Sequence, residues 1–512
     1  MESIFDEQSL PCGRTVPNRL VKVAMYEHLA SIFGGPPNDY HLALYSAWSE
    51  HNWGMIITGN VAVSPSHLTL GRDMVAPSVL KDSTVAPFAK LAGAIHANSS
   101  KCLAIMQLSH AGRQSSNFLG GRRPFASPLG PSALRFGPSD LFHRLLFQTP
   151  KAMSISDIDT VISDFVRGAL LAVQSGFDGV QFHAAHGCKF SFHIKLFWLI
   201  LPFLFLVADP GLRYFLQANI RTDDYSLKSL LLLKRIINGI REVVPQEFIL
   251  GIKFNTTDYS ILDKTRAKKD QEARALAHLH EIISWNVVDF IEISGGNYEN
   301  TEFMLSATAV SSSNPRQAFF AHFSSKLKAE LLKLPPSSHR LPLILLTGGL
   351  RSPAHLHAAL SAKHTDLLGL GRTSVVAPNL PNILNEHIQS RKRGEAILSM
   401  GDDDLEPFKP EPHFSLPAFT KCWPWSLLWE YVPKASLIGA GTRMAWYIVV
   451  MRRLAEERMD LGRTKAPSDY SMGGLGAVFW MWIWFSPGLQ YSGKFWILLM
   501  SIAMLVLFYG VL

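Results

Sequence analysis

Cysteine is scarce in this sequence. Its 512 residues include four cysteines, Cys12, Cys102, Cys188 and Cys422, with no CxxC pair. So small a number excludes a disulfide framework and fits a reducing compartment. The acidic, polar beginning MESIFDEQSL also lacks the pattern of a secretory signal peptide. We therefore expect the fold to depend on a hydrophobic core rather than on covalent cross-links.

Long runs of one charge are absent too. The net charge is +8, which alone would fit an anionic partner such as nucleic acid or lipid. The longest basic run of the body, however, is Arg391-Lys392-Arg393, and such short runs are usually solvated surface. We expect no nucleic-acid partner. The basic excess is clearest at residues 434–465, with seven basic and three acidic residues.

Charge is missing altogether from residues 495–512, FWILLMSIAMLVLFYGVL. This stretch is just long enough to cross a hydrocarbon core of roughly 30 Å. The basic residues before it favour a body that faces the cytosol. We predict a membrane-anchored protein, the alternative being a packed C-terminal helix. Residues 473–489 are also uncharged, and could form a second span, an interfacial segment or a buried helix.

Short apolar runs recur along the first three quarters of the chain, separated by helical or loop stretches. They lie at residues 20–25, 54–58, 102–108, 179–183, 248–254, 287–293, 343–347 and 367–370. Near-continuous apolar runs are typical of parallel strands buried on both faces. Between them, residues 154–174 open with SISD, a helix-capping pattern, and residues 227–243 form an amphipathic pattern.

Eight β/α units predict a (β/α)8 TIM barrel over residues 1–390. A doubly wound sheet would have fewer strands and a glycine-rich turn after the first. Residues 391–472 follow as a linker, with an amphipathic helix at 437–454. Residues 473–512 form a hydrophobic tail with one or two membrane segments. The predicted fold is therefore a barrel with a C-terminal extension and a transmembrane tail.

Polar residues and glycines follow most of the predicted strands, where barrel enzymes place their catalytic groups. Gln107 ends the third strand, and its amide offers both a donor and an acceptor, as needed to bind the edge of a flavin pyrimidine ring. Lys253 ends the fifth strand, where a cation can stabilise an anionic reduced flavin. Taken singly, each could be an ordinary glutamine or a surface lysine.

Two glycine-rich turns, TGGLRS and GLGRTS, follow the seventh and eighth strands. Barrels commonly bind a phosphate there, because glycine lets backbone N–H groups approach an anion. Arg372 can add a charge-assisted hydrogen bond. Either glycine turn alone would more often be only a turn.

Two histidines, His183 and His186, form an HxxH pair at the end of the fourth strand. They could bind a metal as in a hydrolase, but no convincing third ligand is present, and we expect no metal. They could instead donate hydrogen bonds to a carbonyl or phenolate oxygen and polarise it. The pair is thus a candidate catalytic and substrate-binding site.

Several of these motifs together resemble the Old Yellow Enzyme family, more narrowly its fungal NADH:flavin oxidoreductase/NADH oxidase branch. The matching stretches are PNRLVKVAM, IITGN, QLSHAGRQ, GFDGVQFHAAHG, NIRTDDYS, LTGGL and LGLGR. The resemblance implies an FMN-containing (β/α)8 barrel with NADH or NADPH as reductant. The flavin N5 would pass a hydride to an activated C=C of an enone-like small molecule.

The resemblance also assigns roles to individual positions. Those at the flavin ring would be Ala24, Met25, Tyr26, Gly59, Gln107 and Lys253. Those at its phosphate would be Gly348, Gly349, Gly371 and Arg372. Those at the substrate oxygen would be His183 and His186, with Arg113 near the site.

Two positions depart from the family pattern. Tyr26 stands where the family usually has a Thr or Cys that tunes the flavin, and a phenol there would alter the redox potential or crowd the ring. Cys188 stands at the catalytic position of the family's proton-donating tyrosine. It opens an atypical insert, residues 188–217, in place of a short loop.

We hypothesise that this insert, residues 188–217, is a retained intron in a gene model. Cys-Lys-Phe codons can contain a splice-donor sequence, and the apolar composition suits a pyrimidine-rich tract. The alternative is a genuine loop that dips into a membrane at the mouth of the site.

Two functions remain open. The first is a membrane-anchored, FMN-dependent NAD(P)H oxidoreductase of the ene-reductase type. The second is a catalytically impaired, membrane-tethered flavin-binding or scaffold barrel, favoured by Tyr26 and Cys188. A homo-oligomer is compatible with either.

Overall fold

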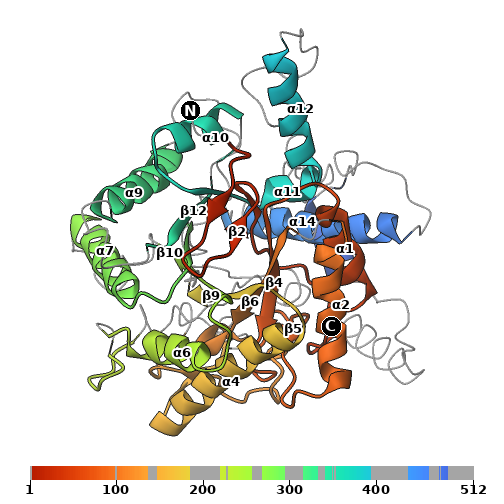
Figure 1. Cartoon of the computed structure of the whole chain (residues 1–512). Helices are drawn as coiled ribbons and strands as arrows, with labels where there is room; N and C mark the ends of the chain where they lie inside the picture. Colours follow the sequence, from red (N-terminus) through yellow and green to blue (C-terminus); the bar gives the residue numbers. More distant parts are fainter. Residues whose placement is uncertain are drawn as a thin grey trace, which may run out of the picture.

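Eight parallel strands close into a barrel in the computed structural model (Figure 1). The structure describes residues 3–98, 101–135, 144, 147–184, 219–226, 229–255, 268–294, 315–331, 341–348, 350, 353–393, 436–459, 472 and 474–482. The barrel strands are β3 (Leu20–Lys22), β4 (Met55–Ala62), β6 (Leu103–Ser109), β9 (Gly179–Ala184), β10 (Ile249–Asn255), β11 (Phe290–Ser294), β12 (Leu343–Thr347) and β13 (Leu367–Leu370). Pairing of β3 with both β13 and β4 closes the ring. The predicted (β/α)8 barrel is confirmed.

The strand bounds agree closely with those predicted, and the main differences lie in the first two strands and in β11, which begins at Phe290 rather than at residue 287. β3 ends at Lys22 rather than at residue 25, whereas β4 continues to Ala62 with a register shift between Ile57 and Asn60. The Gly59 N–H within that shift donates to Glu27 and Tyr45 side chains. Side chains thus satisfy an amide that a regular ladder would have paired with a neighbouring strand.

Helices surround the barrel (Figure 1). They are α1 (Asp39–Ser49), α2 (Asp82–His96), α4 (Ile155–Gln174), α6 (Leu231–Arg241), α7 (Lys268–Ser284), α9 (Pro315–Leu331), α10 (Pro353–Ser361), α11 (Arg372–Val376) and α12 (Leu380–Lys392). The predicted capping box of α4 is confirmed. The Ser154 Oγ accepts from the Asp157 N–H at 3.1 Å, and the Asp157 carboxylate accepts from the Ser154 N–H at 2.9 Å.

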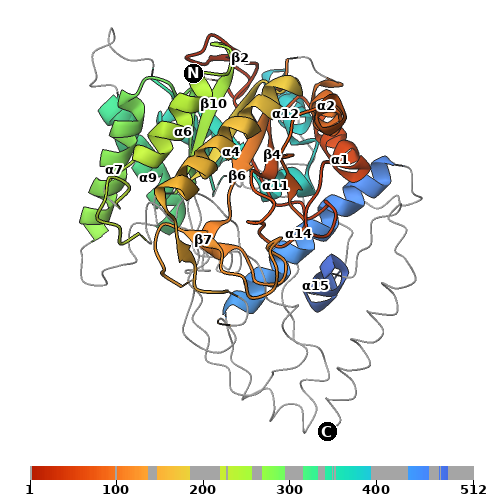
Figure 2. The ribbon, with the colours of Figure 1, turned by 90° about the horizontal axis from the view of Figure 1, so that it is seen from below.

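A short N-terminal hairpin closes one end of the barrel. It pairs β1 (Gln8–Ser9) with β2 (Thr15–Val16). Leu10 and Val16 join the apolar cluster inside the barrel. Figure 2 shows this hairpin at one end of the molecule and the C-terminal helices toward the other. The hairpin therefore covers the N-terminal ends of the strands. Their C-terminal ends, where barrel enzymes place catalytic groups, lie on the opposite side.

The C-terminal extension packs on the barrel as two helices. The helix predicted at 437–454 is confirmed as α14 (Ser436–Arg458), which packs against α1 and α11. α15 (Gly474–Trp482) packs on α14, burying Ala477, Val478 and Met481 (Figure 2). The described part of the 473–489 stretch is thus a short packed helix.

No helix in the described ranges combines the length and the apolar character needed to cross a membrane. The predicted span at 495–512 and the insert at 188–217 lie outside the described residues, so both stay predictions. The chain after the insert, however, is firmly attached. Asn219 is buried, and Arg221 donates to the carbonyls of Pro131 at 3.2 Å and Met153 at 2.6 Å.

Candidate active site

The barrel interior changes from apolar to polar along the strands. The cluster at its N-terminal end includes Val21, Met55, Leu103, Ile249 and Phe290. Toward the C-terminal ends the buried side chains are those of Gln107, Gln181, His183, Lys253 and Glu292, none more than 5% exposed. We call these five the polar layer. Burying five polar groups is costly unless they are hydrogen-bonded to one another or to a ligand.

Four residues of the polar layer form a continuous chain of contacts. Gln107 Nε2 donates to Gln181 Oε1 at 2.6 Å, and Gln181 Nε2 donates to Glu292 Oε2 at 2.8 Å. Lys253 Nζ lies 3.3 Å from Glu292 Oε1. The sequence prediction placed Gln107 and Lys253 at one site, and the structure joins them through two residues that the sequence reasoning missed.

His183 belongs to the same layer. It lies near the end of β9, is 1% exposed, and is the register partner of Lys253 on β10. The other predicted residues of this region, His186 and Cys188, lie outside the described residues, as does Gly349. The structure therefore brings together one histidine of the predicted pair with the expected flavin-facing lysine.

The ends of β3, β12 and β13 adjoin each other, as the predicted ring and phosphate positions require. Ala24 is buried in the interior cluster, and a Cβ added to Gly371 would lie 3.7 Å from Met25 Sδ. Gly348 follows β12 with a φ of 111°, a conformation that favours glycine. Arg372 is the first residue of α11, immediately after Gly371.

Gly59 is held by a buried carboxylate. Its N–H lies 2.9 Å from Glu27 Oε1 and 2.7 Å from the Tyr45 hydroxyl, which itself donates to Glu27. A Cβ at Gly59 would lie 1.8 Å from Glu27 Oε2, so only glycine fits. Burial raises the pKa of Glu27, and the nearby charge of Lys22 opposes that rise. Gly59 thus contributes only backbone to the expected flavin position.

The hydroxyl of Tyr26 makes its hydrogen bonds outside the barrel interior. The Tyr26 oxygen accepts from the Arg72 N–H at 3.3 Å and lies 3.2 Å from His28 Nδ1. Burial, with the charge of Asp73, raises the pKa of Tyr26 well above its usual value. Its ring packs with the outer core rather than with the interior cluster. In this arrangement the hydroxyl fastens the loop after β3 to the loop that contains Arg72.

Arg113 lies in a buried 3-10 turn, Gly112–Gln114, directly after β6 and its adjoining His110. Its Nη1 donates to the Arg135 carbonyl at 3.3 Å. His110 stacks on His67 with ring centroids 4.4 Å apart. Burial, followed by the Arg122 charge, lowers the pKa of His110 to about 3, so the His110 ring in this stack is a neutral imidazole.

Two polar residues in this region, Gln181 and Glu292, were missed by the sequence analysis, and Asn60 was placed at a strand end without a role. Asn60 is the register partner of Gln107 and is buried. Gln181 and Glu292 each stand two residues from another inward-facing position of the same strand, His183 and Ser294. Strand alternation was therefore the signal that could have identified them.

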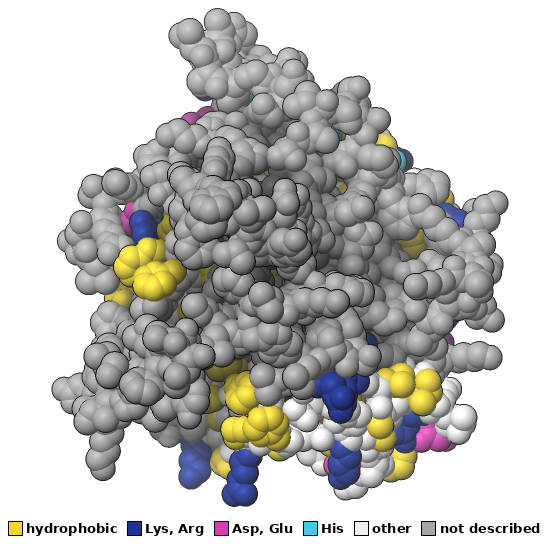
Figure 3. All heavy atoms as spheres, turned by 180° about the vertical axis from the view of Figure 1, so that it is seen from behind, with side chains coloured by type: hydrophobic (Ala, Val, Ile, Leu, Met, Phe, Trp, Pro, Cys, Tyr) yellow, Lys and Arg dark blue, Asp and Glu magenta, His cyan; other side chains and the backbone are white. Residues whose placement is uncertain are grey.

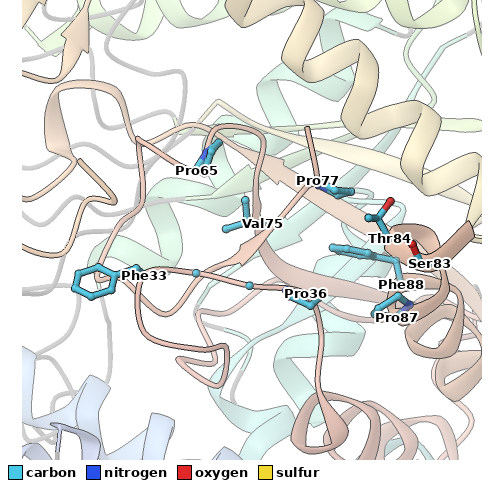
Figure 4. Close-up of a pocket in the computed structure, with 11 residues that line it drawn as sticks. Phe33, Pro36, Pro65, Val75, Pro77, Ser83, Thr84, Pro87 and Phe88 are labelled. Atoms are coloured by element: carbon cyan, nitrogen blue, oxygen red, sulfur yellow. The ribbon is translucent and has the colours of Figure 1, made fainter. Parts of the chain in front are cut away.

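A cavity of about 310 Å³ lies apart from the polar layer. Figure 4 shows Pro36 close to Pro87 and Phe88 of α2, while the Phe33 ring lies at the outer edge and points away from them. None of its lining residues belongs to the polar layer. It has no chemistry that the sequence predicted.

Comparisons with known proteins identify the family of the chain. Residues 12–197 match the model of the NADH:flavin oxidoreductase / NADH oxidase family. The NADH-dependent flavin oxidoreductase iccE of Talaromyces variabilis is 30% identical over 76% of this chain and 88% of its own. The chain belongs to the NADH:flavin oxidoreductase / NADH oxidase family.

Further relatives support this assignment. The NADH-dependent flavin oxidoreductase iliE of Neonectria sp. (strain DH2) is 33% identical over 73% of this chain. The chain spans only 46% of that longer relative. The old yellow enzyme homologue from Zymomonas mobilis has a similar fold, with a TM-score of 0.55 and 18% identity over 75% of this chain and 93% of its own. At that identity it supports the barrel alone.

The residues present fit the flavin cofactor of this family, which uses FMN with NAD(P)H as reductant. Gln107 and Asn60 supply amides, and Lys253 supplies a cation, the groups that a pyrimidine ring and an anionic reduced flavin need. Within the described part of the chain, the buried Thr347 Oγ at the end of β12 has no hydrogen-bond partner. A buried hydroxyl that lacks a partner is a natural contact for a ligand.

Proposed function

We propose that this oxidoreductase passes electrons from NADH or NADPH through FMN to the activated C=C of an enone-like small molecule. The observation that carries the proposal is the polar layer, which gathers Gln107, Lys253 and His183 at the C-terminal end of a closed barrel. Bound FMN would supply the hydride from its N5 atom. Family membership supports the flavin and the reductant, and the substrate class rests on the family resemblance.

The chain's own residues would bind and orient the reactants. Gln107 would hydrogen-bond the ring edge, Lys253 would face the negative charge of the reduced ring, and Arg372 with Gly371 would hold the phosphate. His183 would donate a hydrogen bond to the substrate oxygen and so withdraw electron density from the C=C. Burial of this layer excludes water, which strengthens each of these interactions.

The test begins with the colour of the purified full chain. We expect the spectrum of oxidised flavin, its anaerobic bleaching by NADH or NADPH, and reoxidation by 2-cyclohexenone. A His183→Asn variant should keep the flavin and its bleaching but reoxidise slowly with the enone. Colourless protein that cannot be reconstituted with FMN would refute the proposal.

The second candidate is a flavin-binding barrel with impaired catalysis. It is favoured by Tyr26, whose hydroxyl is occupied by Arg72 and His28, and by Cys188 at the position of the family's tyrosine. Protein that retains FMN and is bleached by NAD(P)H, yet does not reduce any enone supplied, would support this alternative.

We also propose that the extension attaches the barrel to a membrane, with the barrel in the cytosol. Support comes from the uncharged residues 495–512 and the basic excess before them. Phe479 and Trp480 of α15 are about half exposed, at 52% and 48%. Elsewhere on the molecule, at the lower edge of the face drawn in Figure 3, hydrophobic and basic side chains of described residues also lie side by side.

The membrane proposal is tested by fractionation. The full chain should sediment with membranes and resist alkaline carbonate, whereas a chain ending at residue 494 should not. Equal solubility of the two chains would contradict the proposal. Protease protection of the barrel in sealed vesicles would contradict the orientation alone.

A further inference from the structure

Glu292 is a buried carboxylate in the middle of the apolar strand β11. It is fully buried, and its Oε2 is hydrogen-bonded, whereas its Oε1 has an ion-pair neighbour but no hydrogen-bond partner among the described residues. Oε2 accepts from Gln181 at 2.8 Å, while Oε1 lies 3.3 Å from Lys253 Nζ. Lys253 and Glu292 are register partners on β10 and β11. The Glu292 carboxylate thus acts directly on Lys253, and through Gln181 on Gln107. Both of these residues are expected at the flavin, whereas the family resemblance gives Glu292 itself no role.

Gln181 transmits this contact across the barrel. β10 lies between β9 and β11 in the sheet, and at the level of Gln181 it presents Gly251. The ring of Phe290 fills the space beside this glycine, so no β10 side chain at this level separates Gln181 from Glu292. On its other side Gln181 accepts from Gln107, its register partner on β6, at 2.6 Å.

The carboxylate of Glu292 sets which group donates and which accepts in each hydrogen bond from Gln107 through Gln181 to Glu292. An ionised carboxylate can only accept hydrogen bonds, so Gln181 must turn its Nε2 toward Glu292. Its Oε1 then faces Gln107, which must donate through its own Nε2. Gln107 is left with its Oε1 acceptor and one amide hydrogen for a ligand. A glutamine amide can flip by exchanging its oxygen and nitrogen, so its orientation is assigned from the hydrogen bonds around it.

The charge of Glu292 acts on Lys253 as well. Two opposite unit charges at 3.3 Å cancel most of each other's field at larger distance. Lys253 alone would stabilise an anionic reduced ring strongly. Paired with Glu292, it presents a smaller net positive potential.

We propose that Glu292 is a positioning residue for the flavin. It fixes the donor–acceptor sense of Gln107 through Gln181, and it offsets the charge of Lys253. The bound flavin is thereby held at a lower reduction potential than Lys253 alone would give. The inference rests on the FMN binding proposed above and adds a residue that sets the reducing power of the same site.

The experiment measures the reduction potential of bound FMN against a reference dye, without oxygen, in the full chain. Glu292→Gln should shift the flavin–dye equilibrium toward reduced flavin at least tenfold, which is about 30 mV for a two-electron couple. Glu292→Asp keeps the charge and should return the equilibrium to within twofold of the wild type. The dissociation constant of FMN is measured in parallel.

Asp289→Asn is the matched control. Asp289 is also a buried carboxylate, directly before β11, where it accepts from the Leu250 N–H and pairs with Arg241, each at 2.8 Å. Its variant should lose stability but keep the wild-type flavin potential. A merely structural role for Glu292 would make the two variants behave alike.

Each outcome decides the proposal. An unchanged potential in Glu292→Gln, or an equal shift in Asp289→Asn, would overturn it. If Glu292→Gln cannot hold FMN, Glu292→Asp decides: a wild-type potential supports the charge role, and loss of FMN from Glu292→Asp as well overturns it. Wild-type protein that binds no FMN would instead refute the proposed function itself.

Discussion

The two ends of the barrel interior are built from the same strands but from opposite chemistry. At the N-terminal end, Val21, Leu103 and Phe290 pack in an apolar cluster beneath the hairpin. At the other end, Gln181 and Glu292 occupy comparable inward positions and are equally buried. Strand alternation fixes which side chains point inward, so the change in character along a strand lies in the choice of residue.

This difference separates what holds the barrel together from what it does. Burial of apolar side chains stabilises the folded state. A buried ion pair such as Lys253–Glu292 often gives no net stability, because desolvation offsets the attraction. We infer that the polar layer is retained for chemistry and that the apolar end stabilises it. Changes at the two ends should therefore separate stability from flavin properties.

The largest effect on stability is expected from Phe290→Ala. Its ring is fully buried and fills the space beside Gly251, where an added Cβ would lie 2.1 Å from it. The cavity should cost about 3–5 kcal/mol in the free energy of unfolding. Denaturant unfolding in saturating FMN measures this loss, while the flavin potential of the folded fraction should stay at the wild-type value. A potential that moves with the stability would erase the contrast between the two ends.

Breaking the ion pair from the lysine side should cost nearly as much. Lys253→Met leaves the Glu292 carboxylate buried without its cation, at about 3–5 kcal/mol. The double variant Lys253→Met/Glu292→Gln removes both charges and keeps an acceptor for Gln181, so it should recover at least half of that loss. FMN affinity should stay reduced in both variants. Losses that simply add in the double variant would show that Lys253 and Glu292 do not interact energetically, and would contradict the ion pair.

Acid should destabilise the fold partly through His110 at the polar end. The folded pKa of His110 is about 3, lowered by burial, against an ordinary value of 6.5. The unfolded chain therefore binds one more proton between pH 6.5 and 3, and stability is present above pH 6.5 and lost as pH falls toward 3. The slope should be about 1.4 kcal/mol per pH unit for this histidine. His110→Gln should show a correspondingly shallower fall in unfolding free energy, and an identical slope would contradict the assignment.

The sequence was a good guide to the strands because their apolar runs are continuous, and β12 and β13 match the predicted bounds residue for residue. It was less complete at the site. The stretch 287–293 was interpreted as an apolar run, so the charge of Glu292 within it was passed over, although a charge inside a buried strand needs a partner. That partner, Lys253, comes from another strand, and only the closed barrel brings the two together.

The contacts of Tyr26 and the choice among the alternatives for residues 473–489 could not be predicted for a related reason. Sequence identified Tyr26 as a departure from the family, but the direction of its hydroxyl depends on Arg72 and His28. The uncharged stretch before residue 490 has the composition of a membrane segment, and its described part instead buries one face on α14. Composition shows that a helix is apolar, but it does not show whether its apolar face is covered by lipid or by another helix. That depends on tertiary packing.

The smallest effect is expected where the extension meets the polar end. Trp482 of α15 packs edge-on against His28, with ring centroids 5.3 Å apart and an interplanar angle of 81°. Removing the ring in Trp482→Ala should cost about 1 kcal/mol locally, which corresponds to roughly fivefold faster amide hydrogen exchange in α15. Trp480→Ala is the matched control, since Trp480 is half exposed and its carbonyl, which accepts from Arg452, is retained. Faster exchange in Trp482→Ala alone would show that the extension is attached through the loop after β3, next to Tyr26. Equal exchange in both variants would mean that α14 alone holds α15, and the polar end would then lack this support.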